Sequence, residues 1–231
     1  MLYPVSNKHY TPKTDVFSSF QSEPKVRNNL YTLKIHRYKY GEPVSKDTKL
    51  KVLAGSLLGS VLPVLLISKY KKINPLKLKY GMTEMLTVGG GGVIGGVLTG
   101  LAVDKKTHKK TKIHEGIFQL LNVAIPTILV CPLISLCENN KKLNNIPTKA
   151  VMTVGGLIAG MVASAKLANK INDPHDKIPD RKLSIKDSIV NIDEALGVFV
   201  RAKFPIIKDL PIENILPLVY SWGGYRAGTS N

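Results

Sequence analysis

Cysteine, tryptophan and aromatic residues in general are scarce in this sequence, and their scarcity excludes several classes of protein. The 231 residues include two cysteines and one tryptophan, and aromatic residues make up 6% of the chain. A disulfide-stapled domain or a structural zinc site needs more ligands at regular spacing, and the five histidines show no such spacing. Cys131 and Cys137 fall inside an apolar block, where we interpret them as small apolar fillers. We therefore expect no metal site and no cofactor.

Motifs for catalysis are also missing. The sequence contains no phosphate-binding loop, no nucleophile elbow and no pair of carboxylates inside an apolar block. The carboxylate closest to the interior of such a block is Glu84, and its position at the start of a predicted helix is explained by capping. We predict that the protein has no catalytic residues and is not an enzyme.

Charged residues are absent from four blocks, and these blocks indicate the fold class. Asp, Glu, Lys and Arg do not occur in residues 52–68, 85–103, 116–137 and 150–165. About twenty apolar residues in a helix cross the ~30 Å hydrocarbon core of a bilayer. We therefore predict an all-α, multi-pass integral membrane protein with spans over about 50–69, 83–103, 115–137 and 149–168.

A soluble domain is the alternative, because 44% apolar residues and a mean hydropathy of +0.03 also fit soluble proteins. Glycine argues against it. The predicted span 83–103 contains seven glycines, and in water each would cost a helix about 1 kcal/mol relative to alanine. In lipid the helix is enforced, because the backbone has no water to bond with, and the glycines become contact surfaces.

The spans divide the chain into three regions. Residues 1–48 form a polar, basic segment with several prolines, which we expect to be largely extended or disordered. Residues 49–171 form the transmembrane bundle, and residues 172–231 form a carboxyl-terminal amphipathic or interfacial region. Because residues 1–20 lack an apolar run, we predict no cleaved signal peptide.

The bundle contains an internal repeat. Thr-Val-Gly-Gly begins at Thr87 and again at Thr153, and each copy is followed by Leu-Ala and a lysine. Ahead of the copies stand pairs of leucines followed by Pro63 and Pro126 respectively. We predict a four-helix bundle made from a duplicated two-helix hairpin, with repeats over about 50–105 and 114–171. Two crossings return the chain to its starting side, so the repeats should be related by an axis near the membrane normal.

Small residues four positions apart form stripes on three of the predicted helices, which is the pattern of a glycine zipper. The predicted helix-packing residues are Gly55, Gly59, Gly92, Gly96, Gly100, Gly156, Gly160 and Ser164. A neighbouring stripe in the first copy contains Gly91, Gly95 and Thr99. Such stripes pack helices within one chain or between two subunits, and both alternatives stay open here. We expect the first copy, with its two adjacent stripes, to face outward.

Proline and amide side chains lie inside two of the spans. Pro63 and Pro126 each remove one backbone donor and are predicted to kink their helices. Each frees a carbonyl oxygen, for which Ser60 and Asn122 are the candidate side-chain donors. Gln119 and Asn122 are also the candidates for lining a path between the repeats.

Positive charge exceeds negative charge by 17, and most of the lysines flank the spans. Lysine and arginine are more frequent on the side of the amino terminus, so we predict that both termini are cytoplasmic. The bilayer, through its anionic headgroups, is the expected partner of these lysines. A nucleic-acid partner is not favoured, because the charge is not concentrated in one folded module.

Helical signals reappear after the bundle. Ser184 and Asp187 are spaced as a capping box, and apolar residues follow at helical spacing, so we predict an amphipathic helix over 184–204. Residues 211–225 are too short to span a bilayer, and aromatic residues such as Tyr220 predict an interfacial position for them.

Contact surfaces are abundant in this sequence, whereas motifs for chemistry are not. The favoured function is therefore a structural or scaffolding component of a membrane complex, partnered by a second copy or by another membrane protein. The alternative is a channel or transporter component with a path between the two hairpin repeats.

Overall fold

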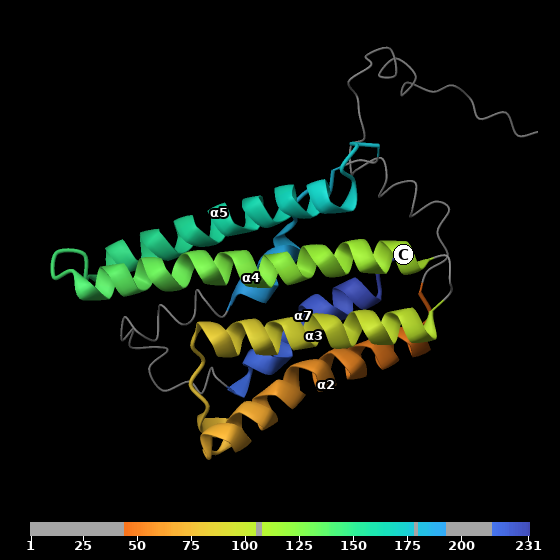
Figure 1. Cartoon of the computed structure of the whole chain (residues 1–231), viewed down its shortest axis with the longest axis horizontal. Coiled ribbons are helices and arrows are strands. Elements are labelled where there is room, and N and C mark those ends of the chain that lie inside the picture. Colours follow the sequence, from red (N-terminus) through yellow and green to blue (C-terminus); the bar gives the residue numbers. More distant parts are fainter. Residues whose placement is uncertain (1–43, 105–107, 178–179, 193–213) are drawn as a thin grey trace, which may run out of the picture.

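A computed structural model describes residues 44–104, 108–177, 180–192 and 214–231 of the chain. All regular structure in these residues is helical (Figure 1). Four long helices, α2, α3, α4 and α5, span Lys46–Lys71, Met82–Val103, Lys109–Asn139 and Ile146–Asn172. The shorter elements are η2 (Pro75–Lys77), η4 (Ile185–Asn191) and α7 (Leu216–Gly228).

The four long helices are each long and apolar enough to cross a membrane. This finding supports the predicted all-α class and a multi-pass membrane protein. Each helix extends beyond its predicted span at one or both ends, because charged and polar residues continue the helix past the apolar block. The predicted extended segment 1–48 lies outside the described residues as far as residue 43, and α2 already begins at Lys46.

Local signals explain where the helices begin. Ser45 precedes α2 and accepts a hydrogen bond from the backbone of Thr48 at 3.1 Å. Asn145 precedes α5 and accepts one from Thr148 at 2.9 Å. At the start of α3 the Glu84 carboxylate accepts the Gly81 N–H, which agrees with the capping role predicted for it. Each cap satisfies a backbone donor that the first turn of a helix leaves free.

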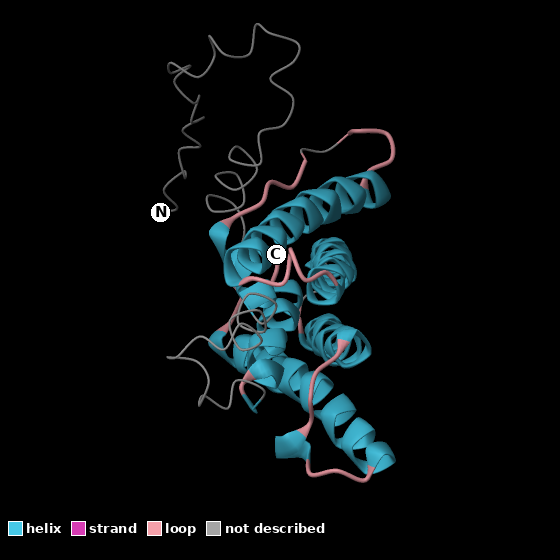
Figure 2. Ribbon diagram, turned by 90° about the vertical axis from the view of Figure 1, so that its left-hand side faces the viewer, coloured by secondary structure: helices cyan, strands magenta, loops and turns pink. Residues whose placement is uncertain are grey.

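The long helices pack in chain order. α2 packs on α3, α3 on α4 and α4 on α5, and Figure 1 shows them as successive rods across the molecule. α7 lies against α2, α3 and α4, and η4 lies against α4 and α7. Figure 2, at right angles to this view, shows only helices and loops in the described residues. The main apolar core sits where α7 meets the bundle, and Val88, Val93, Val123 and Tyr220 are buried in it.

The start of the carboxyl-terminal region differs from its prediction in helix type. The capping box is present, with Ser184 N–H donating to Asp187 at 2.7 Å, but the element it opens is a 3-10 helix that ends at Asn191. Of the amphipathic α-helix predicted over 184–204, residues 185–191 are thus 3-10 helical, Ile192 is α-helical, and the rest lies outside the described residues.

The aromatic residues used to predict an interfacial position include Tyr220, which lies in α7. This helix packs on three helices of the bundle, and the Tyr220 side chain is only 1% exposed, so it contacts protein. The interfacial position of residues 211–225 stays a prediction.

Candidate functional site

Glycines hold α7 against α3 in a fixed register. A Cβ atom added at Gly96 would lie within 3.0 Å of the Gly224 backbone, and one added at Gly100 would lie equally close to the Gly228 backbone. Such distances are essentially never observed for real Cβ atoms. The two helices therefore touch through their backbones, which only glycine permits.

The neighbouring stripe of α3 faces α2. Cβ atoms added at Gly91 and Gly95 would lie within 3.0 Å of the backbones of Gly59 and Gly55. Both stripes of the first copy are thus covered by helices of the same chain. The expectation that this copy faces outward towards another subunit is wrong, because it did not include α7 as a partner for α3.

The small residues of the second hairpin also contact their own neighbour. A Cβ atom added at Gly160 would lie 2.6 Å from Pro126 Cα, and one added at Gly156 would lie 2.9 Å from Val130 Cγ2. Ser164 Oγ lies 2.8 Å from the carbonyl oxygen of Leu121 on α4. All of these contacts join α5 to α4.

Pro63 and Pro126 lie inside helices that continue past them. The side chains expected to satisfy the freed carbonyls bond elsewhere: Ser60 Oγ donates to Leu57 O at 3.0 Å, and Asn122 donates to Asp187 O at 2.9 Å. That part of the prediction is wrong.

A polar stripe runs along one face of α4, from its start into the first half of the predicted span 115–137. Lys112, Glu115, Gln119 and Asn122 succeed one another at intervals of three or four residues, so they share a face. Three of these residues are fully buried, and the side chain of Glu115 is 16% exposed. Polar groups at this depth need partners, because lipid supplies none. The carboxyl-terminal region supplies them.

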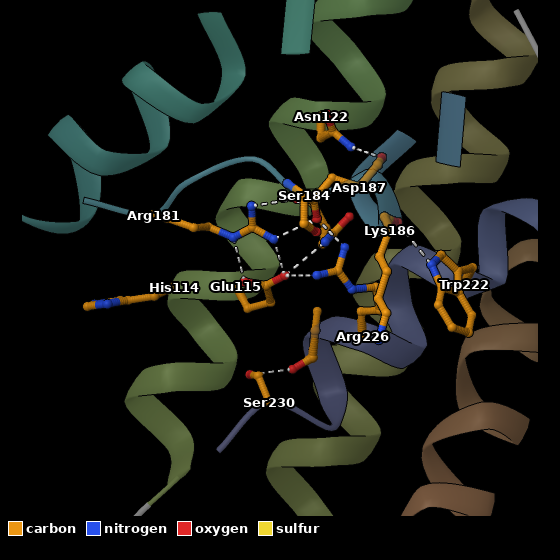
Figure 3. A network of polar contacts seen from close by, with 12 residues as sticks. His114, Glu115, Asn122, Arg181, Ser184, Lys186, Asp187, Trp222, Arg226 and Ser230 are labelled. Atoms are coloured by element: carbon orange, nitrogen blue, oxygen red, sulfur yellow. Dashed lines mark hydrogen bonds and ion pairs between the residues drawn. The ribbon is translucent and has the colours of Figure 1, made fainter. Parts of the chain in front are cut away.

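Two arginines and two carboxylates form the centre of this contact, and Figure 3 shows their side chains pointing toward one another. Arg181 donates through Nε and Nη2 to the two oxygens of Glu115, both at 2.8 Å, and through Nη2 to Asp187 Oδ1 at 2.8 Å. Arg226 of α7 donates to Asp187, and its Nη2 lies 3.7 Å from Glu115. The guanidinium of Arg181 also lies 3.3 Å from the ring centre of Phe118. The four charges balance, so the group is held together without excess charge.

The pKa values reflect this pairing. Burial raises the pKa of Asp187, but the hydrogen bond and charge of Arg181, together with Arg226, outweigh it and lower the pKa to about 2. Burial would lower the pKa of Arg181, but Glu115 and Asp187 raise it above its ordinary value. Asp187 and Arg181 are therefore both ionised at neutral pH.

The outer end of the stripe is closed by Lys112, whose side chain is completely buried. Its Nζ lies 2.7 Å from Asp104 Oδ2 at the end of α3. It also donates to the carbonyl oxygen of Ser230, at 2.7 Å. A lysine near a helix end would ordinarily extend to the interface, whereas this one joins α3, α4 and the residues after α7.

The inner end of the stripe consists of amide side chains. Gln119 Nε2 donates to Glu115 at 2.9 Å, and Asn122 Nδ2 donates to the backbone carbonyl of Asp187. Asn191 of η4 points its amide nitrogen at Asn122 Oδ1, 3.4 Å away. The structure thus brings Gln119 and Asn122 together, but it places them beneath η4 and α7 rather than between the two hairpins.

Several members of this site were not predicted from the sequence: Lys112, Glu115, Arg181, Asp187 as an ion-pair member, and Arg226. Two signals could have found them. One is the run of polar residues at helical spacing in α4. The other is the use of arginine, because only five arginines occur in this lysine-rich chain and two of them lie here. Arginine binds carboxylates with two parallel hydrogen bonds, which lysine cannot do.

Comparison with protein-family models, curated proteins and solved structures finds no match for this chain. Within the residues that the structure describes, no group of three or more His, Cys, Asp or Glu residues is placed to hold a metal ion. Neither Cys131 nor Cys137 forms a disulfide in the described structure, and Cys137 is buried.

Proposed function

We propose that the protein is a non-enzymatic membrane protein that acts as a structural component of a membrane complex. One observation carries the proposal: one glycine stripe of α3 (Gly92, Gly96, Gly100) and the polar stripe of α4 are both covered by the chain's own carboxyl-terminal region. Their contacts fix helices relative to one another. Backbone contact through glycine and balanced buried charges both favour a single rigid arrangement.

The surface that this protein would offer to a partner is the face of α5 that points away from α4. Among the described elements α5 packs mainly on α4, and its other face exposes Val154, Ile158 and Val162. Gly155 lies on that exposed face, and a Cβ atom added there would meet nothing within 4 Å. The partner, a second copy or another membrane protein, is proposed to pack on this face.

Site-specific photocrosslinking in membranes tests the proposal. A photoreactive residue at Ile158 should give a protein adduct of one defined mass, whereas one at the exposed Leu62 of α2 should give lipid adducts only. Epitope-tagged and untagged copies distinguish a second copy from a different protein. Lipid adducts alone at both positions would contradict a scaffolding role for α5.

The proposal of a duplicated two-helix hairpin rests on the sequence landmarks. Both hairpins place a proline of the first helix against a glycine of the second, Pro63 beside Gly91 and Pro126 beside Gly160, but these two glycines occupy different positions of the repeat. The proposals of cytoplasmic termini and of lysines binding anionic headgroups rest, as before, on the lysines at the helix ends.

A channel or transporter component is the second candidate, because Gln119 and Asn122 place amide groups inside an uncharged span. If these groups form part of a path, it runs along α4 beneath the carboxyl-terminal region. Ion flux through reconstituted protein tests this candidate. Flux that is present in the parent and lost in Asn122→Leu would show that a scaffold is not the whole function.

A further inference from the structure

Each hairpin is closed by an ion pair between its two helices. In the first hairpin, Lys71 Nζ at the end of α2 lies 2.5 Å from Glu84 Oε1 at the start of α3. In the second hairpin, Lys149 Nζ of α5 lies 3.8 Å from Glu138 Oε1 at the end of α4. The uncharged blocks of the four helices start within three positions of these residues. Each ion pair therefore marks one edge of the apolar zone of its hairpin.

The contact between α3 and α4 places these two edges at different depths. The helices run antiparallel, and a Cβ atom added at Gly89 would lie 2.5 Å from Val123 Cγ1. In that register Glu84, five residues before Gly89, lies level with Ile128 of α4. Glu138 follows ten residues later, which is about 15 Å along the helix. The second hairpin therefore continues past the edge of the first, and Figure 1 shows the α4–α5 turn projecting beyond the α2–α3 turn.

The opposite edges are displaced in the same direction. The uncharged block of α3 continues as far as Asp104, whereas that of α5 is ended by Lys166. Ser164 Oγ donates to the Leu121 carbonyl of α4, so Lys166 lies less than one turn further toward the start of α4. The register of α3 places Asp104 about ten residues beyond that level, which is again roughly 15 Å. The Lys166 side chain is exposed, so its charge faces the surroundings of the bundle.

The two apolar zones therefore overlap over a short depth. Lys166 marks one edge of the overlap, and the pair of Lys71 and Glu84 marks the other. Between these edges both hairpins are uncharged for about eight residues, which is about 12 Å. The hydrocarbon core of an ordinary bilayer is about 30 Å thick. A flat bilayer that covered the whole apolar zone of one hairpin would place lysines of the other hairpin inside the hydrocarbon, which is costly.

Tilting the bundle does not remove this displacement by itself. Because neighbouring helices pack about 8–10 Å apart, the centres of the two hairpins lie roughly 18 Å apart in the row from α2 to α5. Levelling a step of about 15 Å over that distance requires a tilt of about 40°, the upper end of the range seen for membrane helices. At that tilt the uncharged residues 85–103 of α3 would cross only about 22 Å of hydrocarbon. The tilted bundle therefore also requires a thin bilayer.

From this stagger we infer that the protein thins the bilayer where the two hairpins meet, between α3 and α4. The charges at each edge stay with water and headgroups, because hydrocarbon excludes them. Headgroups on one face of the membrane are thus drawn inward along the first hairpin, and those on the other face along the second. Thinning is a recognised response of lipid to spans that are too short for it. The inference goes beyond the proposed scaffold, because its partner is lipid, and the photocrosslinking result at α5 does not affect it.

The stability of the full chain in bilayers of different thickness tests the inference. The protein is reconstituted in phosphatidylcholine vesicles whose monounsaturated chains contain 14, 18 or 22 carbons. The unfolding midpoint should be highest in the 14-carbon lipid and should fall with each increase in chain length, because mismatch grows with thickness. A midpoint that is highest in the 18-carbon or 22-carbon lipid would overturn the inference.

One variant alters the stagger, and a second controls for the loss of charge. Lys166→Leu extends the uncharged block of α5 as far as Lys170, which lengthens the overlap by about 6 Å. The chain length that gives the highest midpoint should then move from 14 to 18 carbons. Lys142→Leu removes an exposed lysine of the α4–α5 turn, beyond Glu138, and leaves the overlap unchanged. It should keep the optimum at 14 carbons, and equal shifts in the two variants would contradict the inference.

Quenching by brominated lipids measures the depth of each edge directly. In a Trp222→Phe background, Tyr70→Trp and Leu136→Trp each place a single tryptophan near the turn of one hairpin, at side chains that are 88% and 63% exposed. Bromines close to the headgroup should quench both tryptophans best, because the bilayer follows the edge of each hairpin. Quenching of Tyr70→Trp by bromines near the bilayer centre, or no quenching of Leu136→Trp, would indicate a flat bilayer and overturn the inference. If the Trp222→Phe background does not fold, the chain-length series of the parent still decides.

Discussion

α3 and α5 are the corresponding helices of the two predicted repeats, yet they have different surroundings. α3 is packed by α2, α4 and α7, and it contains seven glycines. α5 packs mainly on α4 and contains three glycines. A Cβ atom added at one of them, Gly155, would meet nothing within 4 Å. The number of glycines follows the number of helix neighbours. A helix that packs against several others needs glycine on each face where backbones touch, so α3 needs more glycines than α5.

The largest expected effect is on the ion pairs that hold the carboxyl-terminal region against α4. Asp187→Asn removes one of the two carboxylates that Arg181 and Arg226 share, and breaking a buried pair costs about 3–5 kcal/mol. Unfolding in detergent should show this loss. Asp47→Asn is the control, because the Asp47–Lys51 pair is exposed and should change stability by less than about 1 kcal/mol. Equal effects of the two variants would contradict the importance of the network.

The comparison of α3 with α5 is tested most directly by adding one methyl group to each. Gly96→Ala should destabilise the protein by about 1–3 kcal/mol, because the methyl group overlaps the Gly224 backbone. Gly155→Ala should be neutral or slightly stabilising, because alanine favours the helix and meets no atom. The unfolding midpoints of the two variants test this. A larger loss of stability in Gly155→Ala than in Gly96→Ala would contradict the tighter packing of α3.

Acid should loosen the carboxyl-terminal region from α4 before it affects the contact between α4 and α5. The folded pKa of Asp187 is about 2, below its ordinary value of 3.8, so its ionisation stabilises the fold above pH ~4. That contribution, about 2 kcal/mol, is lost as the pH falls from ~4 towards 2. Unfolding between pH 5 and 2, measured in parent and Asp187→Asn, should show a slope that the variant lacks. A parallel slope in both would assign the pH dependence to other carboxylates.

The smallest expected effects come from two serines that join helices. Ser56 Oγ lies 2.5 Å from Ser221 O on α7, and Ser164 Oγ lies 2.8 Å from Leu121 O on α4. Replacing either with alanine should cost about 0.5–1 kcal/mol, the usual value for such bonds between helices in membranes. Hydrogen exchange should increase in α7 for Ser56→Ala and in α5 for Ser164→Ala. Faster exchange in α5 for Ser56→Ala, or in α7 for Ser164→Ala, would contradict this assignment of the two hydrogen bonds.

The parts of the fold that the sequence predicted depend on local composition. Uncharged blocks gave the four long helices, and Glu84 marked the start of one of them. The position of α7 could not be predicted in the same way, because Gly224 pairs with Gly96 across more than a hundred residues. Spacing identifies a stripe, but it does not say which helix will cover it.

The polar stripe shows the same limit for the site. In the sequence Lys112 lies between two predicted spans, where lysines ordinarily face water and headgroups. Its burial depends on Asp104 and on the carbonyl of Ser230, which is distant in the sequence. Asn122 was recognised as a polar group within a span, but its partner on η4 could not be named until the chain was folded.

The order of synthesis gives the α3–α7 contact a further consequence. At roughly 5–20 residues per second, the ribosome completes α7 several seconds after α3 has left it. During that interval the stripe of Gly92, Gly96 and Gly100 on α3 lacks the helix that later covers it, and Glu115 of α4 lacks its arginine partners. The nascent protein must therefore be sheltered in the membrane, by the insertion machinery or by transient lipid contacts, until its last helix arrives.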